Sequence, residues 1–125
     1  MVEGSLQRVL VVDDDHAVRS IVAETLRGEG YQVDEANNGA AALEQLQAVE
    51  PDVILLDIVM PVVDGYEFLE RLRQERDIAS IPIVLVSATH ALPDAAHELG
   101  VRAVLTKPFD MGMLVAIVDR LARPG

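Results

Sequence analysis

Residues 8–15 read Arg-Val-Leu-Val-Val-Asp-Asp-Asp, and this stretch decides the fold. The first five form a nearly continuous β-branched run, which is typical of a strand buried on both faces of a parallel sheet. Three acids follow at once, and the last of them, Asp15, is a residue type that caps helix N-termini. A helix is therefore predicted to start directly after the strand. A buried strand, acids at its carboxyl end and then a helix are typical of an α/β fold.

The rest of the chain continues this alternation of short apolar runs and helix-period segments. Further strands are predicted over residues 32–36, 53–56, 83–86 and 103–106. Further helices are predicted from Asn38, from Asp64, over 93–99 and around 114–121. In the first helix, the predicted apolar stripe comprises Val18, Ile21, Val22, Thr25 and Leu26. Five strands alternating with five helices predict a doubly wound parallel sheet with helices on both faces.

Length and composition predict one domain spanning residues 1–125, with its core over about 8–121 and no output domain in this chain. Half of the residues are apolar, enough for one core. The absence of cysteine excludes disulfides and thiolate metal sites. No apolar run approaches the roughly 20 residues of a membrane helix, and the N-terminus does not resemble a secretory signal. A cytoplasmic protein is expected.

The charge balance is strongly acidic, with 10 basic and 21 acidic residues and a net charge of −11. Such a surface repels nucleic-acid phosphates and anionic lipid headgroups. Direct binding to nucleic acid or to a membrane is therefore not expected. Most of the carboxylates are interpreted as solubilising surface groups, apart from those at the ends of predicted strands.

Reactive side chains stand at four of the five strand ends, where ligands bind in parallel α/β sheets. They are Asp13 and Asp14 after the first strand, Asp57 after the third, Ser87 after the fourth and Lys107 after the fifth. Adjacent carboxylates repel one another unless a cation joins them. Oxygen ligands without His or Cys favour Mg²⁺, with Mn²⁺ as the alternative. Three carboxylates, one divalent cation and one lysine sum to a neutral site, suited to phosphoryl transfer onto Asp57.

Five segments together resemble the receiver domain of response regulators in two-component signalling, the CheY-like superfamily. They are Val11–Asp15, Leu55–Pro61, Asp64-Gly65, Val86–Ala88 and Thr106–Phe109, and the similarity spans about 8–121. The resemblance implies the flavodoxin-like strand order 2-1-3-4-5. It also implies a phosphoacceptor that assists its own phosphorylation and dephosphorylation, and not a metabolic enzyme.

The resemblance further implies a role for each matching residue. Asp57 would be phosphorylated, and Asp14, Asp57 and the Val59 carbonyl would bind Mg²⁺ directly. Asp13 would act through a metal-bound water. Ser87 would be the switch hydroxyl and Lys107 the partner of the phosphoryl group, with a cis peptide bond between Lys107 and Pro108. The donor would be a sensor histidine kinase or a phosphotransfer protein. The downstream protein partner is not indicated, and a weak homodimer is compatible with this reading.

Two features depart from the family pattern. Val104 stands where the family usually has Tyr or Phe, so the aromatic that follows the switch hydroxyl is missing. The interval from Ser87 to Lys107 looks short, which suggests a trimmed or displaced fourth helix around 92–94. Coupling between Ser87 and the fifth strand is therefore expected to be weaker or to use another side chain.

The residues that flank the phosphorylation site predict a long-lived acyl phosphate. Val59 and Thr89 stand there, and neither is an acid or amide that would position an attacking water. Dephosphorylation in Mg²⁺, followed by mass spectrometry, is the measurement. Loss of the phosphoryl group within seconds would contradict this expectation.

Two other function classes are compatible with an aspartate nucleophile. A haloacid-dehalogenase-like phosphatase needs a second Asp two residues after the nucleophile, where this chain has Val59. It also needs a cap domain, for which 125 residues leave no room. A degenerate receiver acting as a constitutive interaction module is suggested by the missing aromatic, but opposed by the complete set of site residues. The chain is either a stand-alone regulator or a receiver from a larger protein.

Overall fold

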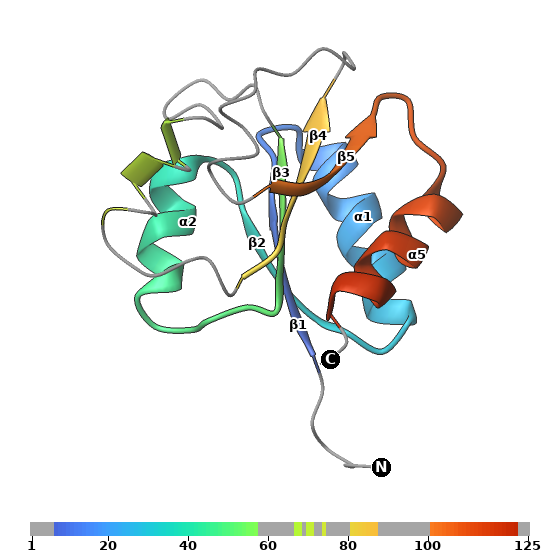
Figure 1. The fold of residues 1–125 in the computed structure, drawn as a ribbon, viewed down its shortest axis with the longest axis horizontal. Helices are drawn as coiled ribbons and strands as arrows, with labels where there is room; N and C mark the ends of the chain where they lie inside the picture. Colours follow the sequence, from blue (N-terminus) through green and yellow to red (C-terminus); the bar gives the residue numbers. More distant parts are fainter. Residues whose placement is uncertain are drawn as a thin grey trace.

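Five strands form one parallel sheet in the order β2-β1-β3-β4-β5 (Figure 1). The computed structural model describes residues 7–57, 67–68, 70–71, 74, 81–87 and 101–122. The strands are β1 (Arg8–Val12), β2 (Gln32–Ala36), β3 (Val53–Asp57), β4 (Ile83–Ser87) and β5 (Val101–Thr106). The predicted fold class and strand order are confirmed. All four strand pairs are parallel, so the carboxyl ends of the strands share one edge of the sheet.

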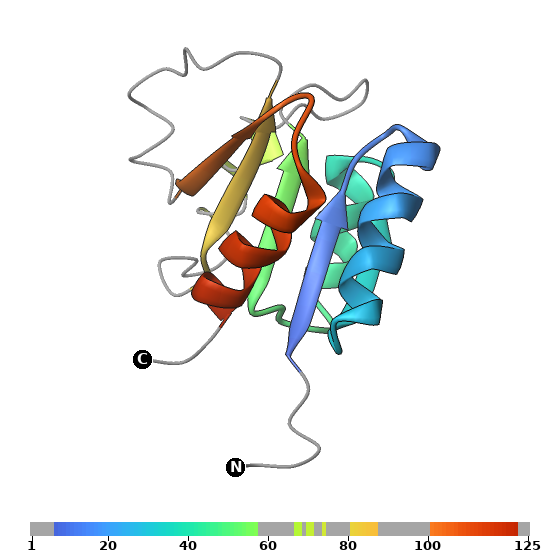
Figure 2. The same ribbon diagram turned by 90° about the vertical axis from the view of Figure 1, so that its right-hand side faces the viewer.

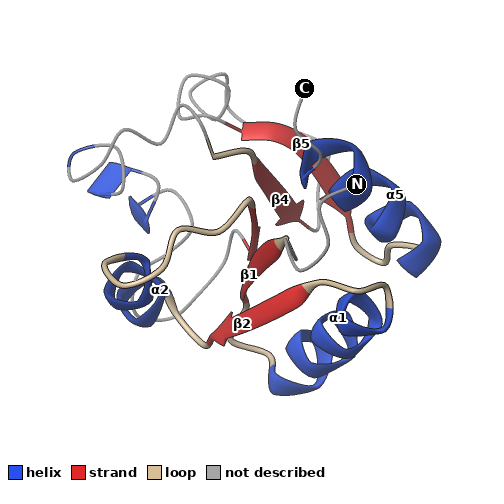
Figure 3. Cartoon of the chain, turned by 90° about the horizontal axis from the view of Figure 1, so that it is seen from below, coloured by secondary structure: helices blue, strands red, loops and turns tan. Residues whose placement is uncertain are grey.

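Helices cover both faces of the sheet. The helices α1 (His16–Gly28) and α5 (Met111–Ala122) lie on one face, and α2 (Gly39–Leu46) lies on the other (Figures 1 and 3). Figure 2 shows α5 lying along β3. Residues 67–68, 70–71 and 74 are helical, within the segment predicted as the third helix. The helix predicted over 93–99 falls outside the described residues.

The first two helices start at the caps that the sequence predicts. The side chain of Asp15 accepts hydrogen bonds from the backbone N–H groups of Ala17 and Val18, at 3.0 and 3.2 Å. Asn38 accepts one from Ala41 at 2.8 Å. These oxygens satisfy N–H groups that have no partner within the helix, which fixes where each chain segment turns into a helix.

One part of the predicted stripe on α1 is wrong. Ile21 was expected to face the core, but 53% of it is exposed. The buried residues of α1 are Val22, Ala23 and Leu26. Ala23 therefore belongs to the buried face of α1, and Ile21 lies outside it.

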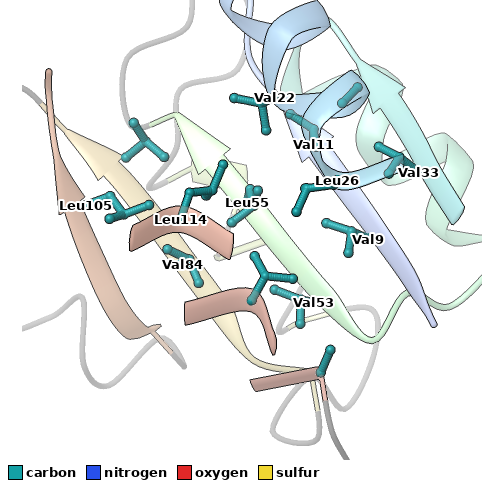
Figure 4. Packing of buried hydrophobic residues seen from close by; sticks show 14 residues of the cluster. Val9, Val11, Val22, Leu26, Val33, Val53, Leu55, Val84, Leu105 and Leu114 are labelled. Carbon is teal, nitrogen blue, oxygen red and sulfur yellow. The ribbon is translucent and has the colours of Figure 1, made fainter. Parts of the chain in front are cut away.

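The sheet separates two apolar clusters, because alternate residues of each strand point to opposite faces. Val9 and Val11 of β1 pack with Val22 and Leu26 of α1 and Leu114 of α5, as Figure 4 shows. Leu10 and Val12 pack on the other face, against Ala42 and Leu46 of α2. Both faces of β1 and β3 are buried, which positions their carboxyl ends firmly.

The β2 strand forms one edge of the sheet, and two of its outward-facing carbonyl groups accept hydrogen bonds from side chains of the helices. Gln32 and Ala36 bond toward β1, so by alternation the carbonyls of Val33 and Glu35 point outward. Arg27 of α1 donates to the Val33 carbonyl at 2.9 Å. Gln45 of α2 donates to the Glu35 carbonyl at 2.7 Å. The helices α1 and α2, which flank β2 in Figure 3, therefore each supply one donor to this edge.

Among the described residues, no helix combines the length and apolar character needed to span a membrane.

Candidate functional site

Two buried acids lie at the carboxyl ends of β1 and β3, which are adjacent strands inside the sheet. Asp57 is the last residue of β3 and is 6% exposed. Asp13 directly follows β1, which pairs with β3, and is 5% exposed. Burying a carboxylate without a partner is costly, so two adjacent buried acids point to a positively charged ligand or neighbour.

Asp14 and Lys107 complete a compact charged cluster. One carboxylate oxygen each of Asp13, Asp14 and Asp57 lies within 4.8 Å of the other two, and Asp14 is exposed. The Nζ atom of Lys107 lies 3.6 Å from Oδ2 of Asp57. Lys107 follows β5, so side chains from three strand ends meet as the sequence predicts. One ammonium offsets only one of three carboxylate charges, and the oxygen-only donor set is compatible with Mg²⁺.

The turn from β1 into α1 is held by hydrogen bonds to the N–H, the side chain and the carbonyl of Asp13. Its N–H donates to the carbonyl of Ala36 at 3.1 Å. Its Oδ1 accepts from the N–H of Asp15 at 2.9 Å. Its carbonyl accepts from Nη1 of Arg19 at 2.8 Å. Asp14 lies between Asp13 and Asp15, whose backbones are held by these hydrogen bonds. The backbone on both sides of Asp14 therefore fixes the direction in which its exposed side chain points.

The remaining predicted site residues are placed as follows. Ser87 ends β4 and its backbone pairs with Thr106, next to Lys107, while its side chain falls outside the described part of the chain. Val59 also lies outside the described residues. The peptide bond between Lys107 and Pro108 is cis, in agreement with the expectation. Val104 is half-buried in β5 and packs against the cluster on the α2 face.

The sequence model of the response regulator receiver domain matches residues 9–119, nearly the whole chain. The chain is a response regulator receiver domain. The fold and the acidic strand ends described above belong to this family, whose members accept phosphoryl groups in two-component signalling. The phosphatase alternative is thereby not supported, because a different family accounts for the chain.

Curated relatives and solved structures agree with this family. The response regulator Rre1 of Synechocystis is 40% identical over 116 residues, which cover 90% of this chain and 50% of the relative. The transcriptional regulatory protein TrcR of Mycobacterium tuberculosis is 39% identical over 97% of this chain and 47% of its own length. The receiver domain therefore spans about half the length of the curated relatives it matches.

The structural likeness extends over whole receiver domains. The chemotaxis response regulator CheY4 of Vibrio cholerae has a TM-score of 0.84 and 32% identity, covering 94% of this chain and 99% of that one. The receiver domain of the sensor histidine kinase PA1611 from Pseudomonas aeruginosa has a TM-score of 0.83 and 28% identity, covering 94% and 98%. That structure holds a magnesium ion in its active-site cleft.

Burial and the neighbouring charge of Asp57 change the acidity of Asp13. Burial, which disfavours the charged form, raises the pKa of Asp13 from 3.8 to about 6. The negative charge of Asp57 and a hydrogen bond to it add to the rise, while the Asp15 N–H and Lys107 oppose it. The receiver domain thus holds one proton at this site more tightly than an unfolded chain does.

This raised pKa predicts that the cation-free receiver domain loses stability as the pH rises. The folded state binds the Asp13 proton more tightly, so its contribution is complete below pH 3.8 and is lost as the pH passes about 6. The difference corresponds to up to about 3 kcal/mol. Thermal unfolding in EDTA between about pH 5 and pH 7.5 measures it. Mg²⁺ should restore stability at the upper pH, and Asp13→Asn should flatten the profile. If stability depended on pH in Asp13→Asn as it does in the wild type, the attribution of this dependence to Asp13 would be contradicted.

Arg19 of α1 is not among the residues predicted from the sequence, although it touches the site. Besides the Asp13 carbonyl, its guanidinium contacts Oε1 of Glu35 at 3.2 Å and Nδ1 of His16 at 3.0 Å. Its side chain is only 13% exposed. The sequence offered one weak signal, a basic residue four positions after the Asp15 cap, which is also a common arrangement on a solvent-facing helix surface.

Proposed function

We propose that Asp57 is the phosphoacceptor of this domain and that it takes a phosphoryl group from a phosphohistidine. The observation that carries the proposal is the convergence of Asp13, Asp14 and Lys107 on a buried carboxylate at the carboxyl edge of the sheet. The buried environment strengthens each electrostatic interaction at that carboxylate. The donor we propose is a sensor histidine kinase or a phosphotransfer protein.

In the proposed reaction, a carboxylate oxygen of Asp57 attacks the phosphorus atom. The bond between phosphorus and the donor imidazole breaks as the acyl phosphate forms, and the imidazole nitrogen keeps the bonding electrons. Mg²⁺, held by Asp14, Asp57 and the Val59 carbonyl with Asp13 acting through water, would offset the charge of the phosphoryl oxygens. Lys107 lies 3.6 Å from Asp57 and would pair with one of those oxygens.

We further propose that Ser87 transmits the change in charge. Phosphorylation replaces one carboxylate charge with about −1.5 to −2, and a hydroxyl at the end of β4 can donate to the added oxygens. Its backbone partner Thr106 precedes Lys107, so β4 and β5 both end at the site. Val104 is too small to follow Ser87 as an aromatic ring would. The response is therefore expected to be centred on the loops that follow β4 and β5.

The proposal also covers where the protein acts and how it passes on its signal. The cysteine-free, acidic sequence is consistent with the cytoplasm and with protein partners instead of nucleic acid. A single domain over 1–125, with its core over about 8–121, fits the family match to residues 9–119. The output is proposed to pass through contacts with other proteins. For the cation site, we propose that Mn²⁺ can replace Mg²⁺.

The test is incubation of the purified protein with acetyl phosphate and Mg²⁺, followed by intact mass and peptide mapping. The expected result is a gain of one phosphoryl group, located on the peptide that contains Asp57 and removed by hydroxylamine, which cleaves acyl phosphates. Omission of the cation should suppress the gain. No gain in the native protein, or a gain on another peptide, would refute the proposal and favour a constitutive interaction module.

A further inference from the structure

The guanidinium of Arg19 joins three parts of the domain next to the acidic site. It reaches the backbone after β1 through the Asp13 carbonyl, β2 through Glu35, and the start of α1 through His16. Arginine carries only donors, in a planar and rigid fork. Because its partners engage Nε, Nη1 and Nη2 and its side chain is 13% exposed, the group is held in one orientation.

The bond to the Asp13 carbonyl acts directly on the backbone that carries Asp14. The carbonyl of Asp13 and the N–H of Asp14 belong to one peptide unit, which is planar up to the Cα atom of Asp14. Fixing that carbonyl oxygen at 2.8 Å therefore fixes the plane from which the Asp14 side chain departs. No tether from α1 other than Arg19 reaches this peptide unit among the contacts of the described residues.

We propose that Arg19 is a positioning residue of the cation site, which orients Asp14 through the Asp13 carbonyl. This inference rests on the proposed function, since it assumes that Asp14 binds the cation. Its effect should be geometric and not due to its charge. A nearby positive charge by itself would weaken Mg²⁺ binding, so removing a purely electrostatic Arg19 would strengthen binding. Removing a positioning Arg19 would weaken it, and the two roles predict opposite signs.

Arg27 provides a matched control on the same helix. It also pairs with Glu35, at 3.3 Å, and it also donates to a backbone carbonyl, that of Val33 at 2.9 Å. That carbonyl lies on the outer edge of β2 and not at the acidic site. Arg27→Met therefore removes the same charge, an ion pair with the same carboxylate and a comparable backbone contact, without touching the peptide before Asp14.

The experiment is calorimetric titration of the full chain with MgCl₂, using wild type, Arg19→Met, Arg19→Lys and Arg27→Met. Outer-shell partners of metal ligands contribute about 10-fold or more to affinity, so both Arg19 variants should bind Mg²⁺ about 10-fold more weakly. Lysine keeps the charge but loses the fork, so Arg19→Lys should not rescue binding. Arg27→Met should stay within about 2-fold of wild type. Circular dichroism establishes that each variant is folded.

A second readout does not depend on the cation. In the cation-free protein, the backbone amide resonance of Asp14 should shift in Arg19→Lys and stay in place in Arg27→Met. Wild-type or tighter Mg²⁺ binding in either Arg19 variant would overturn the role of Arg19, as would equal weakening in Arg27→Met. Failure of the wild type itself to bind Mg²⁺ would instead overturn the proposed function on which the inference rests.

Discussion

Replacing Asp57 with asparagine is expected to reduce phosphoryl uptake from acetyl phosphate to below detection. The amide is nearly isosteric but lacks the carboxylate oxygen that forms the acyl phosphate. The fold should persist and gain stability at neutral pH, because the loss of one buried negative charge beside Asp13 relieves the repulsion that helps raise the Asp13 pKa. Intact-mass spectrometry measures the uptake, and thermal unfolding measures the stability.

The matched control for this variant is Asp52→Asn. Asp52 immediately precedes β3, at the end of the strand opposite Asp57, and its side chain accepts a hydrogen bond from the Arg8 N–H at 2.8 Å. The substitution makes the same chemical change while leaving the site untouched, so phosphoryl uptake should match wild type. Undiminished uptake in Asp57→Asn would show that another residue accepts the phosphoryl group.

The second large effect is expected for Asp14→Asn, which should weaken Mg²⁺ binding by at least about 10-fold. Loss of an outer-shell partner already costs that much in metal sites, and Asp14 is proposed as a direct ligand. One of its carboxylate oxygens lies within 4.8 Å of one carboxylate oxygen each of Asp13 and Asp57. Phosphoryl uptake at limiting Mg²⁺ should fall in parallel and recover partly at saturating Mg²⁺. Calorimetric titration gives the affinity.

Asp15→Asn is the neighbouring control for Asp14→Asn. Asp15 caps α1 through the N–H groups of Ala17 and Val18, and asparagine caps a helix about as well as aspartate does. The variant therefore loses the same formal charge one residue away while the turn keeps its geometry. Mg²⁺ affinity should change by less than about 3-fold, a shift attributable to charge alone. Equal losses of affinity in the two variants would indicate that the overall negative charge near the site binds the cation, and not Asp14 in particular.

The sequence predicted the parts of the fold that follow from local pattern. The strand Arg8–Val12 and the cap at Asp15 have the predicted limits, because a buried β-branched run and a capping side chain act locally. The start of β5 was less accurate, with Val101 in place of Ala103. Val101 pairs with Ile83 across an irregularity in register, which depends on the neighbouring strand and leaves no trace in periodicity.

The site shows the same division between local and tertiary information. Asp13, Asp57 and Lys107 were expected to meet because parallel topology brings the carboxyl ends of strands together. The contact of Arg19 with the Asp13 carbonyl depends on how far α1 tilts over the end of β1, so the sequence could not reveal it. Likewise the exposure of Ile21 depends on where α1 rests on the sheet, which a helical period alone does not specify.

The donors that Arg27 and Gln45 supply to β2 have a consequence for self-association. A foreign strand can extend a sheet only where carbonyl groups at the edge are available to it, and two on this edge are already bonded. We therefore expect this border to resist domain swapping and fibrillar stacking, and a second copy or a partner to dock on helices, loops or the opposite border. The hydrogen bonds from Arg27 and Gln45 therefore protect this edge of the sheet against pairing with a strand of another molecule.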